Sequence, residues 1–163
     1  MKQRLLIVTT CTTILLSVLS IYLYQEKREA KSELYRQELL TFQNHVTGTV
    51  RAVDKGNTDL LDDTFLRIST HETFRSTYVE DSSKAQGMLD NYEQALRYLL
   101  DSKPEDYHQI KDDLRAIFNS LTSYAYNGLS ETDFDEVIEA VSPEVKEFKE
   151  KAQELSESSP SPN

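Results

Sequence analysis

The chain opens with a long apolar run that contains no charged residue. The run covers residues 5–25 and follows a short N-terminal tail, residues 1–4, which carries Lys2 and Arg4. Twenty helical residues rise about 30 Å, which is the thickness of the hydrocarbon core of a bilayer. Hydroxyl side chains within the run can bond back to helix carbonyls and therefore cost little there. The pattern predicts a transmembrane signal-anchor helix over residues 5–25.

Two other fates of this run are less favoured. Cleavage as a signal peptide would use Val18 and Ser20 as the small residues of the site, and it would leave an apolar segment at the new N terminus. Lipidation of Cys11 would need a residue such as Gly or Ala before it, and a threonine stands there. Tyr22 and Tyr24 lie at the distal end, where aromatic rings favour the membrane interface. Retention as an anchor is therefore the preferred interpretation.

Two signals for the orientation of this anchor disagree. Four basic residues follow the span, and a count of Lys and Arg places that side in the cytoplasm; they are Lys27, Arg28, Lys31 and Arg36. A basic tail directly before an apolar run has the form of a signal-anchor, which would keep the tail inside and the rest of the chain outside. We expect the second orientation, and a cytoplasm-facing scaffold stays as the alternative.

Beyond the anchor, apolar residues recur at intervals of three and four, as on one face of a helix. The first such stripe comprises Tyr35, Leu39, Phe42, Val46 and Val53. Lys55-Gly56-Asn57 is expected to end this helix, with Gly56 in a left-handed cap. Further stripes predict helices from about Thr58, over 85–99, within 102–126 and from Ser130, the last with a kink or restart at Pro143.

The segment 102–126 has the most regular stripe, with Ser102 as the expected N-cap. Its apolar positions fall at intervals of 3, 4, 3, 4 and 3: Tyr107, Ile110, Leu114, Ile117, Leu121 and Tyr124. Each apolar stripe must be buried against another helix, and the pattern therefore predicts an all-α fold. We expect the N-terminal single transmembrane helix to continue into an antiparallel bundle of four to five helices over residues 26–157. Residues 158–163 lack apolar side chains and are predicted to be a disordered tail.

Charge and cysteine content exclude several classes of function. The formal net charge is −10, and the part that follows the apolar run carries −12 because Lys2 and Arg4 precede that run. Nucleic-acid binding needs a basic face, so it is not expected. A single cysteine excludes an intrachain disulfide and a cysteine-rich zinc site.

No sequence motif indicates an enzyme or a cofactor. His71-Glu72 would need a second histidine four positions after His71 to form a zinc-protease helix, and Arg75 stands there. Gly-rich phosphate loops and nucleophile elbows are absent from the sequence. The remaining metal candidate is loose calcium binding by Asp59, Asp62 and Asp63, for which the spacing fits poorly. We therefore expect neither a catalytic site nor a metal site.

Tyrosines in the third and fourth helical segments give the one candidate ligand or partner face. They are Tyr92, Tyr98, Tyr107, Tyr124 and Tyr126. Such residues can pack in the core with their hydroxyl groups at its edge, or they can line a groove for a peptide or small ligand. Both interpretations stay open at the level of sequence.

Together these patterns predict a membrane-anchored, non-enzymatic helical-bundle protein that mediates protein–protein interaction or self-association at the cell envelope. The expected location is the cell membrane, with one span and an extracytoplasmic bundle. The order of a short N-terminal tail, one anchor and a helical bundle resembles that of the ligand-sensing bundles of chemoreceptors and of single-pass coiled-coil proteins of bacterial division complexes. The resemblance rests on this order alone and on no sequence motif. An extracytoplasmic sensory module for a small ligand or peptide is therefore an alternative. The sequence names neither the partner nor the oligomeric state.

Overall fold

The computed structural model describes residues 2–70, 82–124 and 131–158, with side chains from residue 12 onward apart from a few at the segment ends. The elements in chain order are α1 (Lys2–Lys55), α2 (Thr58–Thr70), α3 (Ser82–Leu100), the 3-10 helix η1 (Pro104–Ile110), α4 (Lys111–Tyr124) and α5 (Glu131–Ser158). Almost all of the described residues are helical and none lies in a strand. The all-α prediction is confirmed.

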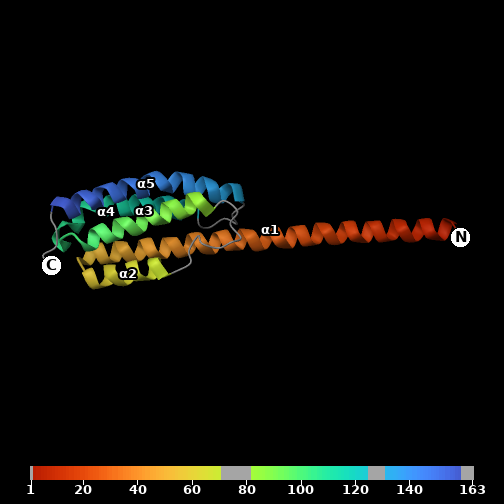
Figure 1. Ribbon diagram of the computed structural model, residues 1–163, viewed down its shortest axis with the longest axis horizontal. Coiled ribbons are helices and arrows are strands. Elements are labelled where there is room, and N and C mark those ends of the chain that lie inside the picture. The colour runs from red at the N-terminus through yellow and green to blue at the C-terminus, as the bar shows by residue number, and fades with distance from the viewer. Residues whose placement is uncertain (1, 71–81, 125–130, 159–163) are drawn as a thin grey trace.

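The helices form a closed bundle from which one end of α1 projects (Figure 1). Contacts run from α1 to α2, from α2 to α3, from α3 to α5, from α5 to α4 and from α4 back to α1. Consecutive helices run in opposite directions, and α2 covers only the end of the bundle far from the N terminus (Figure 1). The expected helical bundle of four to five helices is therefore present.

Aromatic rings from α1, α3 and α5 meet in the middle of the core. Phe42 and Tyr92 lie 5.1 Å apart in an edge-to-face arrangement, and Tyr92 and Phe148 lie 5.6 Å apart. Nearer the projecting end, the rings of Tyr35 and Phe134 stack at 4.6 Å. Such pairs add to the stabilisation from burial alone. Every residue of the predicted first stripe is buried.

The turn between α1 and α2 follows the predicted cap. Gly56 has a φ of 57°, and its N–H donates to the carbonyl of Val53 while the N–H of Asn57 donates to the carbonyl of Ala52. This is the Schellman pattern that closes a helix C terminus. The side chain of Asn57 then accepts a hydrogen bond from the N–H of Leu60 and caps α2. The predicted stop of the first helix and the start of the second are confirmed.

The predicted N-cap at Ser102 is wrong. The Ser102 hydroxyl donates to the carbonyl of Leu99, at the end of α3. Lys103 then precedes the seven residues of η1, after which α4 begins. Tyr107 in η1 also donates its hydroxyl to the Leu99 carbonyl, at 3.0 Å. These two bonds hold the segment back against α3, so a tighter 3-10 turn replaces the first part of the predicted α-helix.

The sequence predicts a kink or a restart at Pro143. The restart is absent, because α5 runs unbroken across this residue, and the kink stays a prediction. Pro143 lacks an N–H and removes one bond from the helical ladder, and it lies on the exposed side of α5. The apolar positions on both sides of it are buried in one continuous face, including Val141, Val145 and Phe148. Packing of that face on α3 and α4 holds the helix together across the proline.

The predicted transmembrane span receives no support from the described residues. Within them, no helix has a stretch that is long and apolar enough to cross a membrane. The domain boundaries predicted around that span stay predictions, and the predicted tail at 158–163 lies outside the described residues except for Ser158, which ends α5.

Candidate functional site

The first candidate site is the part of α1 that projects from the bundle. Every described side chain from residue 12 to residue 30 is exposed. The large apolar ones are 50–71% exposed: Ile14, Leu15, Leu16, Val18, Leu19, Ile21, Tyr22, Leu23 and Tyr24. Apolar side chains of this number on all sides of a free-standing helix indicate an apolar environment or a partner.

The transition from projecting helix to bundle is abrupt. Tyr35 is only 1% exposed and stacks on Phe134 of α5. One turn earlier, the ammonium group of Lys31 lies 5.7 Å from the centre of the Tyr35 ring. The helix itself continues without interruption through this point. The projecting segment is therefore rigidly joined to the bundle.

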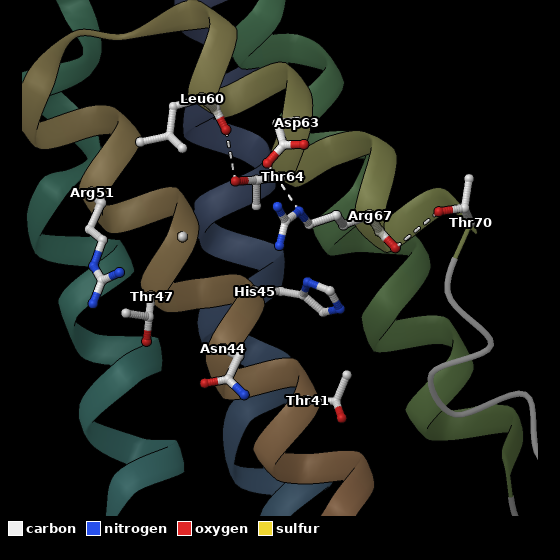
Figure 2. A pocket seen from close by; sticks show the side chains of 11 residues that line it. Thr41, Asn44, His45, Thr47, Arg51, Leu60, Asp63, Thr64, Arg67 and Thr70 are labelled. Carbon is white, nitrogen blue, oxygen red and sulfur yellow. Dashed lines mark hydrogen bonds and ion pairs between the residues drawn. The ribbon is translucent and has the colours of Figure 1, made fainter.

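The second candidate site is a polar cleft between α1 and α2 (Figure 2). It has a volume of about 670 Å³ and is lined by Thr41, Asn44, His45, Thr47, Gly48, Arg51, Leu60, Asp63, Thr64, Arg67 and Thr70. The α1–α2 contact is close here, because a Cβ atom added at Gly48 would lie 3.1 Å from Oγ1 of Thr64. Glycine at this position lets the two helices approach and places their polar side chains opposite each other.

Four threonine hydroxyl groups in the cleft use their protons within their own helices. Thr41, Thr47, Thr64 and Thr70 each donate to the carbonyl four residues earlier, at 2.7–2.8 Å. A hydroxyl group that already donates one hydrogen bond can still accept another through its oxygen. Thr64 is only 5% exposed, so the threonine oxygens that the cleft presents to an occupant as acceptors are those of Thr41, Thr47 and Thr70.

Charged groups in the cleft come from both helices. Arg51 belongs to α1, and Arg67 belongs to α2 and contacts Asp63 through its Nε atom at 3.0 Å. The side chains of that pair are 71% and 50% exposed, so their attraction is weak. No ion pair joins Arg51 to another residue in the part of the chain that the structure describes. His45 is only 8% exposed, and Figure 2 shows it among the residues that line the cleft.

Two of the predicted tyrosines are core residues. Tyr92 is fully buried and donates its hydroxyl to Oγ1 of Thr49 at 2.7 Å. Burial raises the pKa of Tyr92 far above its ordinary value. Tyr107 is buried as well, and burial raises its pKa to about 12. Neither ring offers surface to a ligand in this conformation.

Of the other three tyrosines, only Tyr98 has its side chain among the described residues. Tyr98 is partly buried and packs against the core. The Tyr124 side chain and the whole of Tyr126 lie outside the described residues. The tyrosine groove therefore stays a prediction, and the two buried rings, Tyr92 and Tyr107, would not line it.

Those of the remaining sequence candidates that the structure describes do not assemble into a metal site. Among the described side chains, no group of three or more His, Cys, Asp and Glu residues lies close enough to hold a metal ion. His108 is exposed, with Nδ1 2.8 Å from the carbonyl oxygen of Glu105. His71 and Glu72 lie outside the described residues.

The cleft was not identified by sequence reasoning, although it has a faint signal. Thr41, Asn44, Gly48 and Arg51 recur at intervals of 3, 4 and 3, which places them on one face of α1. The solvated face of an amphipathic helix has the same pattern, so the spacing alone does not indicate a cleft. Comparison with protein-family models, with curated proteins and with solved structures gives no match, and the function is therefore inferred from this geometry.

Proposed function

We propose that the protein is a membrane-anchored, non-enzymatic helical bundle that mediates protein–protein interaction at the cell envelope. The exposed apolar segment of α1 carries this proposal. Residues 12–24 place nine large apolar side chains, each at least half exposed, on the part of α1 that projects from the bundle. With the preceding residues 5–11, whose side chains lie outside the described part, the uncharged run reaches 21 residues. A helix of that length matches the hydrocarbon core of a bilayer.

The interaction surface is proposed to be polar and acidic. The regular stripe of α4 supplies core residues to this chain's own bundle, as Leu114, Ile117 and Leu121 are at most 2% exposed. That stripe is therefore buried within one chain and is not available to contact a second copy. The outer face of α5 carries exposed acidic side chains: Glu136, Glu139, Glu147, Glu150, Glu154 and Glu157. A basic partner surface would complement it.

Membrane association and orientation are tested together by cysteine labelling. A chain with Cys11→Ser and Ser159→Cys carries one thiol near its C-terminal end. Intact cells are treated with a membrane-impermeant maleimide and then fractionated. Labelled protein in the membrane fraction supports an anchored, outward-facing bundle. Membrane protein labelled only after lysis supports the cytoplasm-facing scaffold, and protein in the medium refutes the anchor.

The acidic face is tested by charge substitution on α5. Glu136 and Glu154 are exposed and form no ion pair with another described residue. Replacing both with Lys should abolish crosslinks to partner proteins in intact cells, while replacement with Gln should weaken them. Arg115→Glu on α4 is the control, because it changes the charge elsewhere on the bundle. Crosslinks that persist in the double Lys variant would show that α5 is not the interface.

A further inference from the structure

We propose that the cleft between α1 and α2 binds a small hydroxylated carboxylate. The cleft belongs to the bundle and does not depend on the membrane anchor, so this inference goes beyond the function proposed above. Its volume of about 670 Å³ lies within the range typical of small-molecule sites. Most of its lining residues on both helices are polar or charged, which favours a ligand with polar groups.

The charge balance of the cleft favours an anion. The chain as a whole carries a net charge of −10, yet the lining contains two arginines and one acidic residue. Arg51 forms no ion pair within the described chain, and the exposed contact between Arg67 and Asp63 holds Arg67 only weakly. A guanidinium group binds a carboxylate through two parallel hydrogen bonds, so each arginine is suited to this group.

The uncharged groups of the cleft favour a ligand that also donates hydrogen bonds. The hydroxyl protons of Thr41, Thr47 and Thr70 are used by helix carbonyls, so these three oxygens can only accept hydrogen bonds from a ligand. The Asn44 side chain adds a further acceptor and two donors, and it is exposed toward the cleft. A carboxylate with several hydroxyl groups satisfies both sets: its carboxylate meets the arginines, and its hydroxyl groups meet the threonine oxygens.

Three small compounds test this assignment on the full-length chain in detergent. D-gluconate has a carboxylate and five hydroxyl groups, D-sorbitol has hydroxyl groups without the carboxylate, and propionate has the carboxylate without hydroxyl groups. Binding is measured by titration calorimetry and by shifts of threonine methyl signals in NMR spectra. The expected result is saturable binding of gluconate, with shifts at Thr41 and Thr47, and binding of the other two weaker by at least tenfold. Equal binding of either control compound, or no gluconate binding at 10 mM, would overturn the proposal.

Matched arginine variants locate the site. Arg51→Gln and Arg67→Gln should each weaken gluconate binding about tenfold, because each removes a charged hydrogen-bond donor. Arg115→Gln on α4 removes an exposed arginine outside the cleft and should leave binding unchanged. The three substituted side chains are all exposed, so the variants are expected to fold, which circular dichroism checks. If Arg115→Gln weakens binding as much as the two cleft variants, the effect is one of net charge and the site is refuted.

Discussion

Removal of the buried hydrogen bond between Tyr92 and Thr49 gives a sharp test of the core. The Tyr92 hydroxyl donates to Oγ1 of Thr49 at 2.7 Å, and the Thr49 hydroxyl donates in turn to the carbonyl of His45 at 3.2 Å. Both side chains are fully buried, so neither hydroxyl can exchange its partner for water. The two groups form a chain in which each proton has one acceptor. The perturbation is the pair of near-isosteric changes Tyr92→Phe and Thr49→Val.

The two single changes should differ in cost. Tyr92→Phe removes a donor and leaves Thr49 still bonded to His45, so the loss is that of one net hydrogen bond, about 1 kcal/mol. Thr49→Val leaves the Tyr92 hydroxyl buried without an acceptor, which adds a desolvation penalty and brings the loss to about 2 kcal/mol. The double variant has no orphaned group. It should lose about 1 kcal/mol, well below the value of about 3 kcal/mol expected for independent sites.

Urea unfolding of the full-length chain in mild detergent, followed by circular dichroism, measures these losses. The dependence of the free energy of unfolding on urea should stay constant, so that shifts in midpoint report stability alone. The control combines Thr49→Val with Tyr107→Phe, because Tyr107 donates to the carbonyl of Leu99 in a separate interaction. That combination should be additive. Additive losses in the double variant of Tyr92 and Thr49 would refute the buried bond.

Three further predictions concern pH, the core and the α1–α2 turn. The pKa of Tyr107, about 12, lies above its ordinary value of 10.0, so the folded state holds this proton more tightly than the unfolded state does. The free energy of unfolding should therefore fall as pH rises from 10 towards 12. Urea midpoints across this range should fall less steeply in Tyr107→Phe. Replacing both Leu114 and Leu121 with Asp puts two charges into the core and should abolish cooperative unfolding, whereas a folded variant in circular dichroism would contradict the assigned core. Gly56→Ala should cost about 1 kcal/mol, since φ is 57° and the added Cβ meets nothing closer than 3.8 Å; an unchanged urea midpoint would count against the left-handed cap.

Apolar periodicity predicted most of the helical architecture. Burial of one face follows from the spacing of apolar residues, which is a local property of the sequence. The stripe from Tyr35 to Val53 and the stripe of α5 are both buried as expected. The α1 stop could also be predicted, because Gly56 satisfies a backbone requirement that few other residues meet.

The errors fall where contacts with residues outside a segment decide the structure of that segment. The 3-10 turn at η1 depends on bonds from Ser102 and Tyr107 back to the carbonyl of Leu99, and nothing in segment 102–126 indicates that carbonyl. Proline at position 143 predicted a kink or a restart, and the restart is absent because the packing of α5 on α3 and α4 holds the helix together. Local preference is a weak guide where tertiary packing opposes it.

The candidate sites differ in how far the sequence could indicate them. An uncharged apolar run is recognisable without knowledge of the fold, and the proposed anchor therefore came from the sequence. The cleft depends on which helix covers the polar face of α1, and only the pairing with α2 shows that Arg51 and Arg67 line one cavity. The buried positions of Tyr92 and Tyr107 could not be separated from a groove either, because tyrosine suits both settings.

Helix α1 joins the two proposals physically, since the same continuous helix carries the apolar segment and one wall of the cleft. From Tyr24, at the end of the apolar run, to Asn44 in the cleft there are twenty residues, or about 30 Å along the helix axis. If residues 5–25 lie in a bilayer, the cleft therefore stands well outside the headgroup region and opens to water. A hydroxylated carboxylate can then reach it from solution without meeting lipid. Detergent around the apolar segment likewise leaves the cleft accessible, so gluconate binding should be the same in micelles and in lipid nanodiscs. A loss of binding on transfer from micelles to nanodiscs would place the cleft against the membrane and contradict this geometry.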